Sequence, residues 1–144
     1  MTAKTTSGKM PRMALLVHVD MGILSSLQSA LAERGFTTIV ARDLPTALLA
    51  ITQHHFDVAI VSSQLLEAGD GWPLAGVLHL VFPKAVVSVM APSEPDVLTL
   101  QAAINYGVRE VYEQAKPAKE VVGSIVATLE NSSFSSGSNG SIIQ

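Results

Sequence analysis

The sequence predicts an α/β protein in which a parallel β-sheet is covered by helices on both faces, a three-layer sandwich. Apolar runs of strand length alternate with amphipathic segments of helix length, and glycine, proline and aspartate stand between them. Hydrophobic residues make up 48% of the 144-residue chain. Because every predicted strand is followed by a helix, crossover connections make neighbouring strands parallel. The length suits one domain.

Five short apolar or β-branched runs are predicted to be strands. They lie at 14–19, 37–41, 58–61, 85–90 and 108–112. The run at 85–90 (AVVSVM) is almost continuously apolar, as is typical of a strand buried on both faces of a parallel sheet.

The segments that follow these runs are predicted to be helices. The first carries Ile23, Leu24 and Leu27 at helical spacing and is stopped by Gly35. The second begins after Asp43, whose side chain can accept a hydrogen bond from the first turn. The remaining helices are predicted at 73–81, 96–106 and 118–130.

The two ends of the chain differ in composition from the segment between them. Residues 1–12 are polar and without apolar periodicity, which predicts a flexible N-terminal arm. Residues 131–144 are rich in serine, glycine and asparagine, which predicts a flexible tail or the start of a linker. The folded domain is therefore predicted at 13–130.

Charge and hydropathy exclude several classes of function. Residues 1–12 hold three basic residues and no acid, so the rest of the chain has six Lys and Arg against twelve Asp and Glu. This acidic body does not suit nucleic acid. No apolar run approaches the ~18 residues of a membrane helix. The run at 13–17 is too short for a secretory signal, so we expect a cytoplasmic protein.

Candidate functional residues stand where the predicted strands end. In parallel α/β sheets, ligands bind outside the carboxyl ends of the strands. The residues at these ends are His18, Val19 and Asp20 after the first strand, Ser62 and Ser63 after the third, Met90 and Ala91 after the fourth, and Gln114 after the fifth. A cysteine nucleophile and a thiolate metal site are excluded because the chain has no cysteine.

Four segments resemble the receiver domain of two-component response regulators over about residues 13–130. They are LLVHVDMGILSSL (15–27), DVAIVSS (57–63) with GDGW (69–72), AVVSVMAP (85–92) and NYGVREVYEQ (105–114). The resemblance implies a flavodoxin-like fold with strand order 2-1-3-4-5 and a role in phosphorelay signal transduction.

The chain departs from the receiver pattern at the positions that carry the family's chemistry. The acidic pair that holds Mg²⁺ in receivers aligns with His18 and Val19. The phosphoacceptor aspartate aligns with Ser62 when counted from Asp57, or with Ser63 when counted back from Asp70. Met90 replaces the hydroxyl residue, and Gln114 replaces the lysine, although Lys116-Pro117 follows two residues later.

These replacements remove the groups that aspartyl phosphorylation needs. Mg²⁺ requires oxygen ligands, which valine lacks and which histidine replaces with a softer nitrogen. Phosphoryl transfer also needs cations around the transferred oxygens, and serine would form a stable ester instead of a labile acyl phosphate. We therefore expect a degenerate receiver without metal, cofactor or enzymatic activity.

Two other interpretations stay open. Asp20 or Asp70, with Lys116, could form a displaced phosphorylation site, although these aspartates also suit a helix cap and a glycine-flanked turn. His18, Ser62 and Gln114 could line a crevice that senses a small ligand. A catalytic Ser–His pair is not expected, because no G-x-S-x-G motif is present. Nor is a glycine-rich dinucleotide-binding loop present.

A partner-binding face is implied by the resemblance. Receivers commonly bind partners or form homodimers through the face built from their fourth helix, fifth strand and fifth helix, here residues 96–130. This segment combines apolar and charged residues in the manner of an interface with a charged rim: Leu98, Ile104, Arg109, Tyr112 and Lys116. We expect a signalling protein as partner and a homodimer through this face.

Overall fold

The computed structural model describes residues 12–142, with side-chain burial from 12 to 131. A five-stranded parallel sheet has the order β2-β1-β3-β4-β5, as predicted. The strands are β1 Arg12–Val17, β2 Phe36–Ala41, β3 Val58–Ser62, β4 Val86–Ala91 and β5 Glu110–Glu113. Arg12, predicted to end the flexible arm, instead begins β1. Residues 1–11 of that arm lie outside the described residues.

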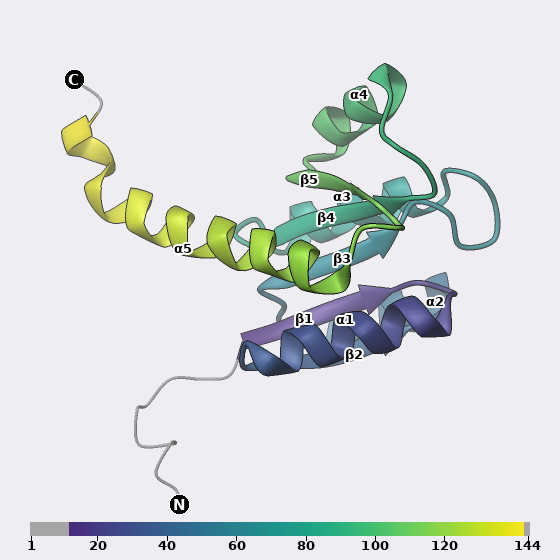
Figure 1. Ribbon diagram of the computed structural model, residues 1–144. Coiled ribbons are helices and arrows are strands. Elements are labelled where there is room, and N and C mark those ends of the chain that lie inside the picture. Colours follow the sequence, from purple (N-terminus) through teal and green to yellow (C-terminus); the bar gives the residue numbers. More distant parts are fainter. Residues whose placement is uncertain (1–11, 143–144) are drawn as a thin grey trace, which may run out of the picture.

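Helices cover both faces of the sheet and complete the three layers (Figure 1). They are α1 Met21–Glu33, α2 Leu44–Gln53, α3 Gly71–Val81, α4 Val97–Tyr106 and α5 Ala118–Ile142. Helices α1 and α5 contact each other on one face, and α3 contacts α4 on the other. No helix in the described range 12–142 is long and apolar enough to cross a membrane.

Two hydrophobic cores lie on the two faces of the sheet. One contains Leu15 and Val17 of β1 and packs under α2, α3 and α4. The other contains Ala14 and Leu16 of the same strand and packs under α1 and α5. Because successive strand residues point to opposite faces, β1 contributes to both cores and is buried on each side.

Aspartate caps fix where three helices begin. The side chains of Asp20, Asp43 and Asp96 accept hydrogen bonds from backbone N–H groups in the first turns of α1, α2 and α4. The caps predicted at Asp20 and Asp43 are confirmed. Helix α4 ends at Gly107 with φ of 72°, the left-handed conformation that glycine adopts without steric strain. These caps place the loops that follow β1, β2 and β4.

Several element boundaries differ from the sequence prediction by one or two residues. Strand β1 ends at Val17, so His18 and Val19 belong to the loop. Strand β5 begins at Glu110 and not at 108, because the Val108 N–H donates to Ala103 O and completes the end of α4. Helix α3 begins at Gly71, two residues before the predicted start.

Helix α5 extends past residue 130, into the segment predicted to be a flexible tail. Its backbone remains helical to Ile142, and only residues 143–144 of that tail lie outside the described residues. The first turns are anchored by Val121, Val122 and Ile125, which are fully or almost fully buried. Once a helix is nucleated, each further residue adds a hydrogen bond at a lower entropic cost. Composition alone therefore misplaced the end of this helix.

Candidate functional site

The strand-end residues singled out in the sequence gather at the carboxyl edge of the sheet. Ser62 pairs with Met90 in the register of β3 and β4. The Ser63 N–H donates to Met90 O at 2.9 Å, and the Gln114 N–H donates to Ala91 O at 2.8 Å. The His18 N–H donates to Ala41 O at 3.2 Å, which ties the β1 end to β2. The predicted crevice residues thus share one edge.

His18 is a buried side chain in the loop between β1 and α1. It is 3% exposed, and its Nδ1 accepts a hydrogen bond from the Asp20 N–H at 3.1 Å. An accepting Nδ1 carries no proton, so the neutral ring is protonated at Nε2. Nε2 has no hydrogen-bond partner among the described residues. Burial lowers the pKa of His18, and the smaller opposing effects of Asp20 and Gln114 do not restore it.

The positions next to His18 and across the sheet offer no oxygen ligand. Val19 is 39% exposed and apolar. Met90 is almost fully buried in the core under α1 and α5. Its thioether is a weak acceptor and cannot donate a hydrogen bond to a phosphoryl oxygen. Neither side chain can replace the carboxylate or hydroxyl of a working receiver.

Ser62 uses its hydroxyl group in a local turn. Ser62 Oγ donates to Gln64 O at 2.8 Å and accepts from the Gln64 N–H at 3.2 Å. Ser62 is 2% exposed and Ser63 is 6% exposed, so an incoming group has little access to either hydroxyl. His18 is not a hydrogen-bond partner of either serine, and no nucleophile–base pair is formed in the described structure.

Asp70 holds the loop between β3 and α3 closed. Its Oδ1 accepts from the Leu65 N–H at 2.6 Å, and its Oδ2 accepts from the N–H groups of Leu66 and Glu67 at 2.9 and 3.0 Å. Desolvation would raise the pKa of Asp70, but these backbone donors outweigh it and the pKa lies below its usual value. The turn interpretation of Asp70 is confirmed, because both oxygens serve the loop.

Asp57 lies at the other end of the sheet from the candidate site. It immediately precedes β3, and its Oδ2 accepts a hydrogen bond from the Met13 N–H at 2.9 Å, near the start of β1. The carboxylate therefore joins the amino ends of two strands. Asp57 has a structural role and is remote from the phosphoacceptor position.

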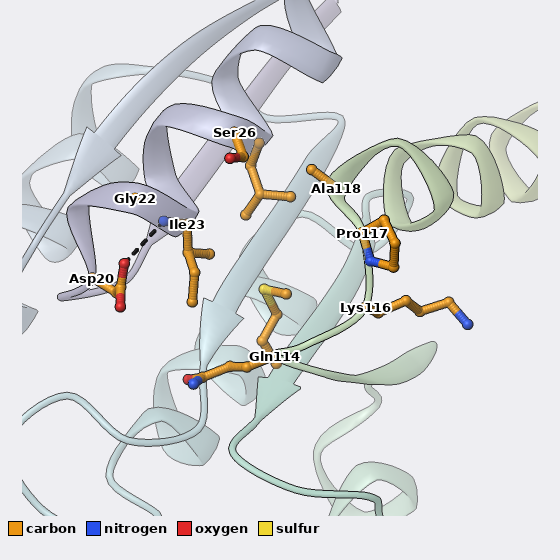
Figure 2. A pocket seen from close by; sticks show the side chains of 10 residues that line it. Asp20, Gly22, Ile23, Ser26, Gln114, Lys116, Pro117 and Ala118 are labelled. Carbon is orange, nitrogen blue, oxygen red and sulfur yellow. Dashed lines mark hydrogen bonds between the residues drawn. The ribbon is translucent and has the colours of Figure 1, made fainter.

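Asp20 and Gln114 line a cavity of about 410 Å³ beside the carboxyl edge, between the start of α1 and the β5–α5 connection. Its apolar wall includes Ile23, Leu27 and Met90. Figure 2 shows Asp20 capping α1 through the Ile23 N–H, at 3.0 Å. Gln114 and Lys116 leave the β5–α5 connection in opposite directions, so Lys116 points away from Asp20 (Figure 2). His18 and Ser62 do not line this cavity.

The sequence analysis missed the α1 side of this cavity. Gly22, Ile23 and Ser26 contribute to its lining. Ile23 and Ser26 are three residues apart and therefore lie on one side of the helix, a spacing that could have placed them together with Asp20. No pattern in the sequence indicated that the β5–α5 connection would leave an open space opposite them.

The divalent ion that the receiver fold implies does not fit these residues. Mg²⁺ needs an octahedron of oxygen ligands with one or two carboxylates. At the carboxyl edge, the Asp70 carboxylate accepts hydrogen bonds from backbone N–H groups of its own loop, and Asp20 caps a helix. Within residues 12–142, no group of three or more His, Cys, Asp or Glu could hold a metal ion. No step through a bound metal is therefore derived.

The predicted partner-binding residues are exposed, with one exception. Leu98 and Ile104 are 75% and 79% exposed, and Arg109 and Lys116 are also exposed. Tyr112 is 6% exposed, so the prediction that it lies on the interface was wrong. It points into the core under α1 and α5, and its hydroxyl donates to Glu110. Burial and this carboxylate raise the pKa of Tyr112.

Comparison with solved structures identifies receiver domains as structural neighbours. A receiver domain protein of Methanospirillum hungatei is 18% identical with a TM-score of 0.76, covering 85% of this chain and 96% of that chain. The receiver domain of an HD domain-containing protein of Pseudomonas fluorescens is 25% identical with a TM-score of 0.73, covering 85% and 90%.

A third neighbour was solved with its phosphorylation site occupied. This response regulator of Burkholderia pseudomallei, with a phosphorylated aspartic acid and a calcium ion, is 16% identical with a TM-score of 0.72, covering 87% of this chain and 72% of that chain. The sequence itself matches no protein-family profile and no curated protein sequence. The chain thus has the flavodoxin-like fold of response regulator receiver domains.

Proposed function

We propose that this chain is a degenerate receiver that acts in signal transduction through protein–protein contact, without Mg²⁺-dependent aspartyl phosphorylation. One observation carries the proposal. At the carboxyl ends of β1 and β3, where the receiver pattern requires carboxylates, the chain places His18, Val19 and two buried serines.

The remaining groups at this edge support the same proposal. Asp70 binds three backbone N–H groups, and Asp20 caps α1 with one oxygen. Lys116 points away from Asp20 (Figure 2). An acceptor carboxylate needs a free oxygen and cations on the transferred phosphoryl group. Asp70 lacks the free oxygen, and the Lys116 side chain does not face Asp20.

Intact-mass measurement after incubation with acetyl phosphate and Mg²⁺ tests this proposal. We expect no added phosphoryl mass. A hydroxylamine-sensitive adduct would contradict the proposal and favour an active receiver with a displaced site. Asp20→Asn and Asp70→Asn would then identify the acceptor, because only the variant lacking it would lose the adduct. A hydroxylamine-resistant adduct would instead indicate a serine ester and would equally contradict the proposal.

We assign partner binding to the α4–β5–α5 face. Val97, Leu100 and Ile104 form an exposed apolar stripe along α4, at spacings of three and four residues. Arg109 and Lys116 add a charged rim. In cells, proximity labelling with Ile104→Glu should lose a partner that the native chain and Gln28→Glu, an exposed change on α1, both retain. Retention by all three chains would place the partner elsewhere.

A small-ligand sensor is a second candidate because of the cavity beside Asp20. Its volume of about 410 Å³ falls within the usual range for ligand sites, and it combines apolar walls with an amide and a carboxylate. A metabolite that raises the melting temperature should lose this effect in Gln114→Ala. Thermal-shift screening without such a metabolite would leave the contact-driven function as the better account.

A further inference from the structure

Helices α2, α3 and α4 contain no aspartate, glutamate, lysine or arginine. Exposed apolar side chains occupy their outer sides instead. Leu80 and Val81 of α3 are 79% and 49% exposed, and Leu98 of α4 is 75% exposed. Within residues 12–131, the only large apolar side chain exposed on α1 or α5 is Met21. Monomeric soluble proteins rarely present an extended apolar surface without a binding role.

A groove between α3 and α4 lies within this uncharged surface. It has a volume of about 270 Å³ and is lined on the α3 side by Pro73, Gly76, Val77, His79 and Leu80. Asn105 and Tyr106 line it on the α4 side. The Tyr106 ring packs so closely on Gly76 that a Cβ there would lie 2.8 Å from it. This close packing gives the groove a fixed shape.

We propose that a second copy of this chain binds the α3–α4 groove in a two-fold symmetric dimer, with Leu80 of each copy against the groove of the other. A two-fold contact requires a projection and a hollow on the same surface, because each copy presents the same patch. Leu80 provides an exposed apolar projection beside the hollow. Leu98 lies two helical turns before Asn105 and extends the apolar surface along that side of α4.

Charge favours a second copy as the occupant. The chain has a formal net charge of −3, so contacts between its charged surfaces are repulsive on average. A two-fold contact places each group near its own copy, and α3 and α4 contain no Asp, Glu, Lys or Arg that would be repelled in this way. The one basic residue of these helices is His79, which lines the groove. A membrane is disfavoured because binding to lipid headgroups draws on Lys and Arg, which these helices lack.

The proposed contact is separable from the α4–β5–α5 face, to which the sequence analysis assigned a homodimer. Val97, Leu100 and Ile104 form one stripe of α4. Leu98, which the sequence analysis assigned to the α4–β5–α5 face, instead shares a second stripe with Asn105, seven residues later. Tyr106 contacts Gly76 and Trp72, which places α3 beside this second stripe. Substitutions at Leu80 and Ile104 therefore test two different surfaces.

Light scattering coupled to size-exclusion chromatography, over a concentration series of the full chain, tests this inference. We expect a concentration-dependent dimer. Leu80→Glu should weaken it by roughly tenfold or more, because the contact loses a buried leucine and gains two facing carboxylates. Met21→Glu, which changes an exposed apolar residue of α1 in the same way, should leave the dimer intact. Ile104→Glu should also leave it intact.

Three outcomes would overturn the inference. They are a native chain that stays monomeric at every concentration, a dimer lost in Ile104→Glu but kept in Leu80→Glu, and a monomer that co-floats with uncharged phosphatidylcholine vesicles. Circular dichroism confirms folding of each variant, and Leu80→Gln replaces Leu80→Glu should the latter unfold. None of these results depends on the phosphodonor experiment, so the dimer and the proposed function can fail separately.

Discussion

Helices α1 and α5 carry charged residues on their solvent side, whereas α2, α3 and α4 carry none, although both groups pack on the same sheet. Glu33, Lys119 and Glu120 are exposed on the first group. Their inner sides are alike, because each group buries aliphatic residues against alternate positions of the strands. The fold therefore sets the inner sides of the helices and leaves the outer sides to be determined by what they contact.

The largest expected effect tests whether the two inner sides are energetically equivalent. Leu31 of α1 and Leu78 of α3 are both fully buried. We expect Leu31→Ala and Leu78→Ala each to lower the free energy of unfolding by about 3 kcal/mol, through lost burial and the cavity left behind. Urea denaturation measures both. A loss of under about 1 kcal/mol in only one variant would show that one layer is loosely packed.

Glycine-to-alanine substitutions should have opposite signs in the two layers. In α3, a Cβ on Gly76 would lie 2.8 Å from the Tyr106 ring, so Gly76→Ala should destabilise by about 1–2 kcal/mol. In α5, the nearest atom to a Cβ on Gly123 is Arg34 Nη2 at 3.7 Å. Gly123→Ala should stabilise by roughly 0.5–1 kcal/mol, because alanine loses less entropy in a helix.

Thermal unfolding of these two variants measures both signs. Gly76→Ala combined with Tyr106→Ala should recover part of the loss. Destabilisation by Gly123→Ala would show that α5 is packed as tightly at this position as α3 is at Gly76.

The cap of α1 should have a smaller effect. Asp20→Ala removes the acceptor of the Ile23 N–H and should lower the free energy of unfolding by about 1 kcal/mol. Asp20→Asn keeps a side-chain oxygen at the same position, so its free energy of unfolding should fall by less than that of Asp20→Ala. Denaturant unfolding of both variants measures the difference. Equal losses would show that the charge of Asp20, and not its hydrogen bond, stabilises the start of α1.

The smallest expected effect is a pH dependence of the free energy of unfolding that arises from His18, in the loop before α1. The pKa of His18 is lowered in the folded state by burial, so the unfolded chain binds a proton more readily. Its contribution to stability is complete above the unfolded pKa of about 6.5 and is lost as the pH falls toward the folded pKa. Protonation of Nδ1 would also break the hydrogen bond from the Asp20 N–H.

His18→Asn offers a non-titrating acceptor to the same N–H. Urea unfolding between about pH 7.5 and 5 should therefore show a weaker loss of stability in this variant than in the native chain. An unchanged dependence would assign the effect to other groups.

The order of elements could be predicted from the sequence because each boundary is marked locally. Asp43 caps a helix and Gly107 ends one, and both are identifiable from residue type alone. The direction of Tyr112 could not be predicted this way. Strand β5 has only four residues, and both Val111 and Tyr112 are apolar enough to face a core. Alternation with a period of two is therefore ambiguous there by one residue.

The carboxyl edge could be predicted as a set of positions but not as a set of contacts. Parallel crossovers bring the ends of β1, β3 and β4 together whatever their residues are. Loop geometry determines that Ser62 forms hydrogen bonds with Gln64 and that Nε2 of His18 has no partner among the described residues. Loops have no regular hydrophobic period from which such contacts could be predicted. The absence of Asp, Glu, Lys and Arg from α2, α3 and α4 is a property of the sequence, but the face of the sheet that these helices cover follows only from the fold.

The turn built on Ser62 determines what an aspartate would do at this position. Aspartate at this position would place a carboxylate where a hydroxyl now both donates to and accepts from Gln64. Nearby, Gly71 leaves no room for the loop to shift, because a Cβ there would overlap the carbonyl oxygen of Ser62. Ser62→Asp alone would thus disturb the turn and the adjoining loop. The local packing therefore couples the residue at position 62 to the shape of the whole β3–α3 loop.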